Sequence, residues 1–400
     1  MKSVNSESLL AAIMLAFLAT AGLFYVNLGG AFLSAFVDGL GISRQDAGYI
    51  TAANKYGAAF GALIATFGIR YFQWKKTAYI ILPLMIAVDV LSFQITDANL
   101  LKYIRFGHGT IGGFLVGIGL GVIARTNDPD KGYGMLLVVQ YTFGSLGIYF
   151  VPKLVSSFGH GAAFGALICF SLITLMMVPF IPDYKVKSEQ EAIAGSGTNK
   201  GLIIFPLVLA MLSIFMFQAS NMGIADYAIE LGKENGYEVS AISDWLSLAN
   251  IISVSGAVLV FVIGSKYGRF KPLLIGLTLQ AIFTYAFHWS EDPKIYFIAN
   301  TVTGIGWAFV IPYLLGLLAS FDGHGQMGAL AGFISKLGLA SGPMVAAYLV
   351  GENDFSAIIN TASVGLAICA VAVFIPALKV DHTTKVNNSN SKELDGEKTA

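Results

Sequence analysis

The chain contains twelve apolar stretches, six on either side of one long polar segment at 183–200. Each stretch is roughly 18–29 residues long, which is enough for a helix to cross a hydrocarbon layer of about 30 Å. Inside a bilayer a helix satisfies its own backbone polar groups, whereas an irregular chain does not. The stretches therefore predict transmembrane helices at 9–36, 46–68, 77–95, 100–124, 132–152, 161–181, 201–229, 242–264, 272–289, 294–319, 327–349 and 355–377.

This arrangement predicts an all-α membrane protein in which twelve transmembrane helices form two six-helix bundles. We expect an N-terminal bundle at 1–182, a cytoplasmic interdomain loop at 183–200, a C-terminal bundle at 201–380 and a disordered cytoplasmic tail at 381–400. The tail is polar and has few apolar residues with which to form a core. The first apolar stretch is too long for a cleavable signal peptide, so it is predicted to be the first membrane helix.

The composition agrees with a membrane location and argues against several other classes of protein. Only 12% of the residues are charged, against about 25% in soluble domains. The net charge of zero gives no reason to expect a nucleic-acid partner, and the two cysteines lie inside apolar stretches. We predict no metal site and no cofactor. Motifs of ATPases, lipases and zinc proteases are absent, so we expect neither an ATP-driven pump nor an enzyme.

The lysines and arginines of the predicted loops indicate the orientation of the chain. Sixteen of the 24 fall on the side of the N-terminus and five on the opposite side. Positive charge is enriched in cytoplasmic loops, so both termini are predicted to be cytoplasmic. We expect a multi-pass monomer in the inner or plasma membrane, surrounded by the lipid bilayer. Three basic residues remain inside predicted helices: Lys55, Arg105 and Lys336.

The two halves of the chain also resemble each other weakly. Asn-Leu-Gly at 27–29 in the first predicted helix matches Asn-Met-Gly at 221–223 in the seventh. The loops at 70–76 and 266–271 are both short and basic. Internal repeats of this kind are typical of transporters whose substrate binds between the two halves.

Three short motifs resemble those of the major facilitator superfamily, and the resemblance covers nearly the whole chain. The segment 264–271 (Gly-Ser-Lys-Tyr-Gly-Arg-Phe-Lys) is similar to the family's basic loop between helices 8 and 9. The segment 105–109 (Arg-Phe-Gly-His-Gly) matches its Arg-x-x-x-Gly motif in helix 4. The segment 338–343 in helix 11 (Gly-Leu-Ala-Ser-Gly-Pro) is similar to the Gly-x-x-x-Gly-Pro motif that antiporters carry in helix 5.

Two positions depart from the family pattern. In the segment 61–76, Ala65 stands where the family usually has Asp, and the segment 140–145 of helix 5 lacks the antiporter proline. The second departure argues against antiport. The resemblance implies a twelve-helix fold that alternates between inward- and outward-open states around a central substrate site.

Lys55 and Lys336 are predicted to lie at one depth. Each is about 14 Å from one end of its helix and so near the middle of the bilayer, where an unpaired charge is costly. In the family's fold their helices line the seam between the bundles, so the resemblance implies that both ammonium groups face one cavity. A bound anion, or loss of a proton, would relieve their repulsion. Alternatively, each lysine pairs or reaches the membrane surface within its own bundle.

Three residues are candidates for proton coupling. Asp89 and Arg105 lie at similar depths on neighbouring antiparallel helices, so an ion pair is the simplest interpretation of both. The pair either stabilises the fold or lets Asp89 carry a proton whose affinity Arg105 tunes. Asp226 either faces the central cavity or is solvated at the outer end of helix 7.

Glycines follow Arg105 at four-residue spacing. This spacing either lets a neighbouring helix approach closely or leaves a groove along the cavity wall. The glycines are Gly109, Gly113, Gly117 and Gly121.

Polar and aromatic side chains recur on the helices expected to line the cavity. Amides and hydroxyl groups orient a polar ligand, while Tyr and Trp add an apolar surface with one polar group. Each of these residues alone is also explained by a helix–helix hydrogen bond. We predict that the two lysines bind substrate together with the following residues: Tyr25, Asn27, Gln140, Tyr141, Gln218, Asn221, Asn300 and Trp307.

The excess of buried positive charge predicts proton-coupled uptake of a small organic anion, such as a carboxylate with or without an aromatic ring. The alternative is proton-coupled efflux of amphipathic compounds, which the motif at 338–343 and the cavity aromatics favour. A third hypothesis is a sensor that has the fold but does not transport. It would need a partner-binding domain, and the tail of about 20 residues is too small and polar to be one.

Overall fold

The computed structural model describes residues 3–68, 73–123, 125–126, 129–184, 204–263, 267–319, 321, 326–350 and 354–397, and its regular elements there are helical. The first half forms α1 (Leu9–Ala21), α2 (Phe24–Asn27), α3 (Gly29–Leu40), α4 (Arg44–Gly68), α5 (Trp74–Phe93), α6 (Ala98–Ile123), α7 (Pro129–Phe158), α8 (Gly161–Met177) and the 3₁₀ turn η1 (Val178–Phe180). The second half forms α10 (Ile204–Ala225), α11 (Ala228–Glu234), α12 (Val239–Ile263), α13 (Phe270–Tyr285), the 3₁₀ turn η2 (Ala286–Trp289), α14 (Pro293–Ala319), α15 (Gln326–Leu349) and α16 (Ser356–Glu397).

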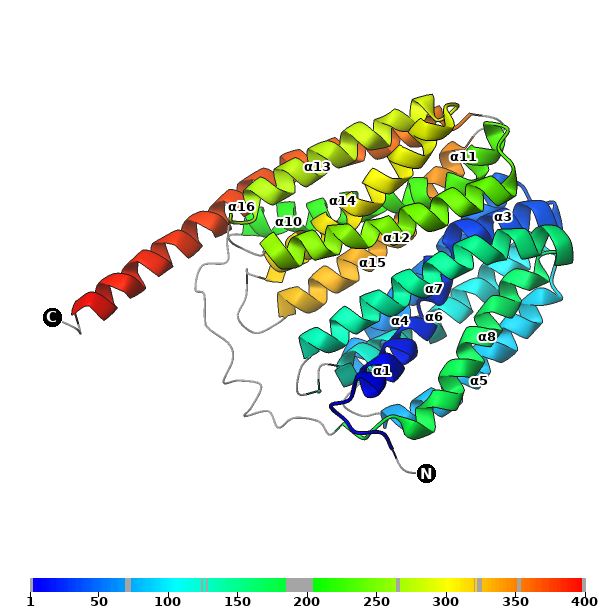
Figure 1. Cartoon of the computed structure of the whole chain (residues 1–400), viewed down its shortest axis with the longest axis horizontal. Coiled ribbons are helices and arrows are strands. Elements are labelled where there is room, and N and C mark those ends of the chain that lie inside the picture. Colours follow the sequence, from blue (N-terminus) through cyan, green and yellow to red (C-terminus); the bar gives the residue numbers. More distant parts are fainter. Residues whose placement is uncertain are drawn as a thin grey trace.

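The two halves form two bundles that pack side by side (Figure 1). They meet along two long helix pairs, α4 with α15 and α7 with α12, and at a shorter contact of α3 with α11. The start of α1 and the end of α16 lie at one end of the molecule, which we call the near end. The opposite end, which holds the turn between α3 and α4, is the far end. Which end faces the cytoplasm stays a prediction from the loop charges.

Ten helices of the described residues are long and apolar enough to cross a bilayer. The other two predicted membrane helices differ for separate reasons. Helix α4 has 25 residues, but polar side chains such as Asn54 and Lys55 make it less apolar. The first predicted helix is interrupted and forms α1, α2 and α3. The all-helical membrane fold is confirmed, with two of its predicted crossings less regular than expected.

The first and seventh predicted helices are both broken near the middle of the molecule. In the first, Leu28 separates α2 from α3. In the seventh, Asp226 and Tyr227 separate α10 from α11. Discontinuous helices of transporters place polar groups at the interface between repeats. The second break accordingly brings the carboxylate of Asp226 to the seam between the bundles.

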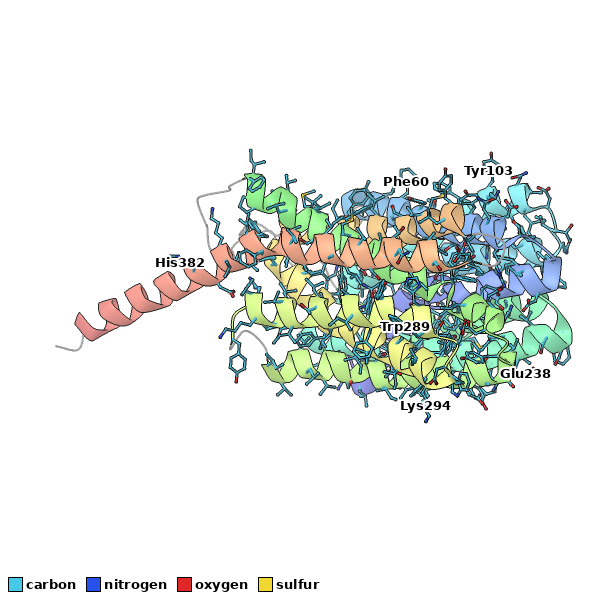
Figure 2. The ribbon with its side chains drawn as sticks, turned by 90° about the horizontal axis from the view of Figure 1, so that it is seen from above. Phe60, Tyr103, Glu238, Trp289, Lys294 and His382 are labelled. Carbon is cyan, nitrogen blue, oxygen red and sulfur yellow. The ribbon has the colours of Figure 1, made fainter. Side chains whose placement is uncertain are left out.

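Large apolar side chains cover the outside of the bundles. Phe60, Tyr103 and Trp289 are exposed, and Phe60 and Tyr103 lie along the upper edge of the molecule in Figure 2. A soluble protein buries most residues of this kind. In a bilayer they contact lipid tails, so the exposed apolar surface agrees with the membrane location.

Helices α4 and α6 pack backbone against backbone through glycines. A Cβ at Gly109 would overlap the carbonyl oxygen of Asn54, and one at Gly113 would overlap that of Ala58. Only glycine permits so close an approach. At these two positions the four-residue spacing found in the sequence therefore serves helix packing.

Gly109→Ala should destabilise the protein, because its methyl group must push α4 away from α6. Overpacking of this kind typically costs about 1–3 kcal/mol. Gly107 is the matched control, since a Cβ there meets no atom within 4 Å and Gly→Ala inside a helix gains roughly 0.5–1 kcal/mol. Thermal unfolding of the detergent-purified variants measures both effects. Equal melting temperatures for the two variants would contradict this packing.

Helix α16 continues to Glu397, so 381–397 is helical where the sequence predicted a disordered tail. Residues 378–395 contain neither Gly nor Pro, so no strong helix breaker ends the helix, and it projects beyond the bundle in Figure 1. The predicted interdomain loop at 183–200 lies outside the described residues from 185 onwards.

Candidate functional site

A buried ion pair joins the two bundles near their centre. Lys55 of α4 donates from Nζ to a carboxylate oxygen of Asp226, in the break between α10 and α11. The two side chains are 1% and 2% exposed, so both charges are out of water and depend on each other. A Cβ at Gly29, the first residue of α3, would overlap this carboxylate. Glycine at that position makes room for the pair.

This pairing joins two residues that the sequence treats separately. Lys55 was expected to be a free cation beside Lys336, and Asp226 to be a separate proton site. In the structure Asp226 neutralises Lys55, so the two ammonium groups are not both free. Asp226 is also buried, which excludes the alternative that it is solvated at the end of its helix.

Lys336 lies in the middle of α15, about 15 Å from one helix end and about 20 Å from the other. It is partly exposed, and it forms no hydrogen bond or ion pair with any residue that the structure describes. Ala340 and Ala347 lie on the same helix face, and Ala347 contacts Gly48 of α4. Lys336 therefore lies on the face of α15 that is turned towards the N-terminal bundle.

Hydrogen bonds hold the polar side chains around Ser335, the residue before Lys336, in place. Ser335 Oγ accepts from Gln218 Nε2 at 2.6 Å, and Gln218 Oε1 accepts from Trp307 Nε1 at 2.7 Å. These bonds connect α10, α14 and α15. Two predicted binding residues, Gln218 and Trp307, are thus linked to the residue that precedes Lys336.

Other predicted amides are already engaged within the C-terminal bundle. Asn221 of α10 donates to the carbonyl oxygen of Phe217 at 2.7 Å and accepts from Gln280 of α13. Asn300 donates to the carbonyl oxygen of Tyr296 on its own helix at 2.8 Å. Hydrogen bonds inside the bundle therefore account for Asn221, and a bond within one helix accounts for the amide nitrogen of Asn300. The sequence analysis did not identify Gln280.

The predicted residues of the N-terminal bundle have fewer partners. The hydroxyl groups of Tyr25 and Tyr141 and the amide nitrogen of Asn27 are buried without a hydrogen-bond partner among the described residues. Tyr25 is enclosed in the bundle, with its ring centroid 4.5 Å from that of Phe32. Gln140 of α7 is partly exposed. In this conformation Tyr25 therefore lies away from the surface that a ligand could reach.

The predicted ion pair between α5 and α6 is confirmed. Arg105 Nη2 lies 2.8 Å from Asp89 Oδ1, and both side chains are fully buried. His108 Nε2 lies 3.3 Å from the same oxygen. His108 was not predicted to join this pair, although its i+3 spacing from Arg105 places both on one helix face.

Arg105→Met should destabilise the protein by about 3–5 kcal/mol, because Asp89 is then a buried carboxylate without its strongest partner. The double variant Arg105→Met/Asp89→Leu buries no charge and should regain most of that loss. Thermal unfolding of the purified variants in detergent tests this. If the two variants are equally unstable, the loss comes from packing and not from the unpaired charge.

A chain of charged residues closes the seam at the far end. Lys233 of α11 lies 2.5 Å from Asp38 of α3 and 2.7 Å from Glu230. Arg44, the first residue of α4, lies 3.2 Å from Glu230 and 2.9 Å from Glu234. In the sequence these residues indicated only loop charge and orientation. Their meeting depends on how the bundles are placed.

The polar contacts that join described side chains of the two bundles lie in the middle and at the far end. Near the middle, Tyr56 Oη lies 2.9 Å from Ser341 Oγ. Also near the middle, Asn250 donates to Ser145 Oγ at 2.9 Å, and towards the far end Lys153 lies 2.5 Å from Asp244. The seam is therefore held shut from its centre to the far end.

Comparisons with known proteins agree with this architecture. Residues 207–399 match the sequence model of the Major Facilitator Superfamily. The structure resembles the nucleoside transporter NupG (14% identity, TM-score 0.69, covering 92% of this chain and 99% of that chain). It also resembles a D-xylose-proton symporter, with 16% identity and a TM-score of 0.69, covering 93% of this chain and 96% of that chain. A third similar structure is the human organic anion transporter TETRAN, with 15% identity and a TM-score of 0.63, covering 91% of this chain and 97% of that chain. No curated protein sequence matches the chain.

At these identities the structural neighbours establish the fold, and they do so over more than nine-tenths of the chain. The family model adds sequence evidence for the C-terminal half. The chain is therefore a multi-pass membrane protein whose residues 207–399 match the Major Facilitator Superfamily by sequence. Over its whole length it has the fold of the solved membrane transporters that it resembles.

Proposed function

We propose that this protein is a secondary active transporter that takes up a small organic anion, such as a carboxylate, together with a proton. The observation that carries the proposal is the position of Lys336, a cation in the middle of a membrane helix with no partner among the described residues. One structural neighbour is named as a proton symporter and another as an organic anion transporter. These neighbours agree with the proposal, but their similarity concerns the fold.

Lys336 needs an anion or water beside it. A cation at this depth is stable only next to a counter-charge or a water-filled cavity, and partial exposure makes its side chain accessible. A carboxylate of the substrate would supply the counter-charge. Trp307, which is partly exposed and held by its hydrogen bond to the buried Gln218, would form an aromatic wall for the rest of the molecule.

The pair of Lys55 with Asp226 would act as the switch. Protonation of Asp226 removes the negative charge that holds Lys55, so that α4 and the α10–α11 break can separate. The released ammonium group then becomes a second cation for the substrate carboxylate. One proton and one anion enter together in this scheme, and the pair forms again only after both have left.

The charged chain at the far end would act as a gate. With both termini in the cytoplasm, the far end faces outwards, and a seam held shut there corresponds to an inward-facing state. Opening to the outside requires the contacts of Arg44 and Lys233 to break. Arg44 and Lys233 are 19% and 16% exposed, but Glu230, which both contact, is 1% exposed. Opening the gate would therefore bring the buried carboxylate of Glu230 into water.

Efflux of amphipathic compounds is the alternative function. The segment at 338–343 favoured it, but in the structure Gly338 and Gly342 pack against the backbone of α10 at Phe215 and Ala219. Helix packing accounts for these glycines without antiport. Efflux would be favoured if expression of the protein raised the tolerance of cells to toxic lipophilic cations.

Purified protein in liposomes tests the proposed uptake. A thermal-shift screen of organic acids and lipophilic cations first identifies ligands, because a ligand stabilises the state that it binds. We expect an organic acid to stabilise the protein and to accumulate in liposomes when protons flow inwards, and a protonophore to abolish the accumulation. If only lipophilic cations stabilise the protein and no acid accumulates, the anion assignment is wrong.

A further inference from the structure

Four buried side chains from three helices surround one imidazole ring in the N-terminal bundle. Asn54 lies on α4, Asp89 on α5, and Arg105 and His108 on α6, and none is more than 3% exposed. Asn54 Nδ2 donates to the backbone carbonyl oxygen of Arg105 at 2.9 Å, and the same nitrogen lies 3.0 Å from His108 Nδ1. The other ring nitrogen of His108, Nε2, lies 3.3 Å from Asp89 Oδ1.

These contacts determine which ring nitrogen of His108 carries the proton. A backbone carbonyl oxygen only accepts hydrogen bonds, so the Asn54 atom that faces Arg105 must be the amino group. That group has a second hydrogen, which is directed to His108 Nδ1, and Nδ1 must therefore accept. The proton of the neutral ring is then on Nε2, which lies 3.3 Å from Asp89 Oδ1 but forms no hydrogen bond with a described residue.

We propose that His108 is a second proton-binding site of this protein and that Asn54 is the positioning residue that controls its occupancy. A proton that arrives at Nδ1 turns this nitrogen into a donor, which then faces the amino group of Asn54. The amide must turn so that its oxygen accepts the new hydrogen, and it loses its bond to the carbonyl of Arg105. Proton binding at His108 is thus linked to a rearrangement on α4, one residue before Lys55.

Several polar atoms around the His108 ring have no hydrogen-bond partner among the described residues. These buried atoms are His108 Nε2 itself, Asp89 Oδ2, Arg105 Nε and Nη1, and the hydroxyl group of Tyr25. Leaving such groups unsatisfied costs about 1–3 kcal/mol each, so they are suited to ordered water that carries protons. The groups that face His108 are Asp89 from α5, Arg105 from α6, and the Tyr25 ring of α2 at 6.3 Å. The opposite charges of Asp89 and Arg105 balance, so a proton on His108 would give this cluster a net charge of one.

This proposal extends the proton coupling proposed above, but its test does not need a transported substrate. The full-length protein is labelled with ¹⁵N-histidine and reconstituted in nanodiscs, because nitrogen chemical shifts distinguish the two neutral tautomers from the doubly protonated ring. His108→Gln assigns the signal by its loss. His160→Gln is the control, since that ring lies elsewhere, 3.1 Å from the carbonyl oxygen of Phe93.

At neutral pH we expect the wild-type His108 signal to be that of the neutral Nε2–H tautomer. Asn54→Asp offers Nδ1 an acceptor, so the doubly protonated form should replace that signal. Asn54→Leu should give a mixture of neutral tautomers. This apolar variant of similar size keeps the test possible if Asn54→Asp does not fold. A wild-type Nδ1–H tautomer, or an Asn54 variant with an unchanged His108 signal, overturns the proposal. Failure of anion uptake in liposomes would overturn the proposed function and leave these spectra unaffected.

Discussion

Asp226→Ala should stop proton-coupled uptake and lower the free energy of unfolding by about 3–5 kcal/mol, because Lys55 is left as an unpaired charge out of water. Lys55→Ala leaves Asp226 unpaired and should have the same two effects. The double variant Lys55→Met/Asp226→Leu buries no charge, and such replacements are often neutral for stability. It should unfold near the wild-type temperature and still fail to couple uptake to the proton gradient. If stability recovers and transport does not, the pair is needed for coupling to protons as well as for folding.

Thermal unfolding in detergent and uptake into liposomes, with and without a proton gradient, measure these two effects. Lys153→Ala is the matched control, since Lys153 also pairs across the seam, with Asp244. These side chains are 29% and 54% exposed, so that pair should contribute about 1 kcal/mol or less. If Asp226→Ala is as stable as the control, the buried pair does not hold the bundles. If the double variant transports normally, the pair is not the switch.

Lys336→Ala should abolish binding of the anion and raise the stability of the ligand-free protein. Truncating one partner of a buried charged contact costs about 2–5 kcal/mol of binding, which is roughly 30-fold or more in affinity. In the ligand-free protein the same change removes a cation with no partner among the described residues, and alanine costs less to place at that depth. Lys336→Arg keeps the charge and should retain weaker binding.

Ligand titrations by thermal shift give the stability and the affinity of each variant in one measurement. Lys294→Ala serves as the control, because Lys294 is an exposed cation on the surface of the molecule (Figure 2). It should change neither quantity. An unchanged affinity in Lys336→Ala would exclude this residue from the binding site. A lower stability of the ligand-free variant would show that Lys336 has a structural role.

Contacts between neighbouring helices could be predicted from the sequence, and contacts between the bundles could not. The pair of Asp89 with Arg105 follows from two antiparallel helices joined by a short turn, with both charges at one depth. Lys55 and Asp226 are 171 residues apart. Their pairing also requires the seventh helix to break at Asp226, which no proline signals. A depth estimate alone placed Lys55 beside Lys336 and missed its partner.

Single polar residues on an apolar helix were harder to interpret. Tyr25, Asn221 and Trp307 have the same features in the sequence, a polar group on a helix expected to face the cavity. In the structure Tyr25 is enclosed among aromatic rings, Asn221 is engaged within its bundle, and Trp307 is linked through Gln218 to the neighbour of Lys336. Rotation of a helix about its axis decides between these outcomes, and weakly amphipathic helices carry little signal for it.

The sequence by itself determined that the chain crosses a membrane many times and folds as two bundles of helices. It could do so because a bilayer leaves each crossing segment only one way to satisfy its backbone, which makes length and apolarity sufficient evidence. The tertiary structure decided which buried charges neutralise each other and which one is left for a ligand. Out of water a charge needs a partner within a few ångströms, and here that partner comes from a distant part of the chain.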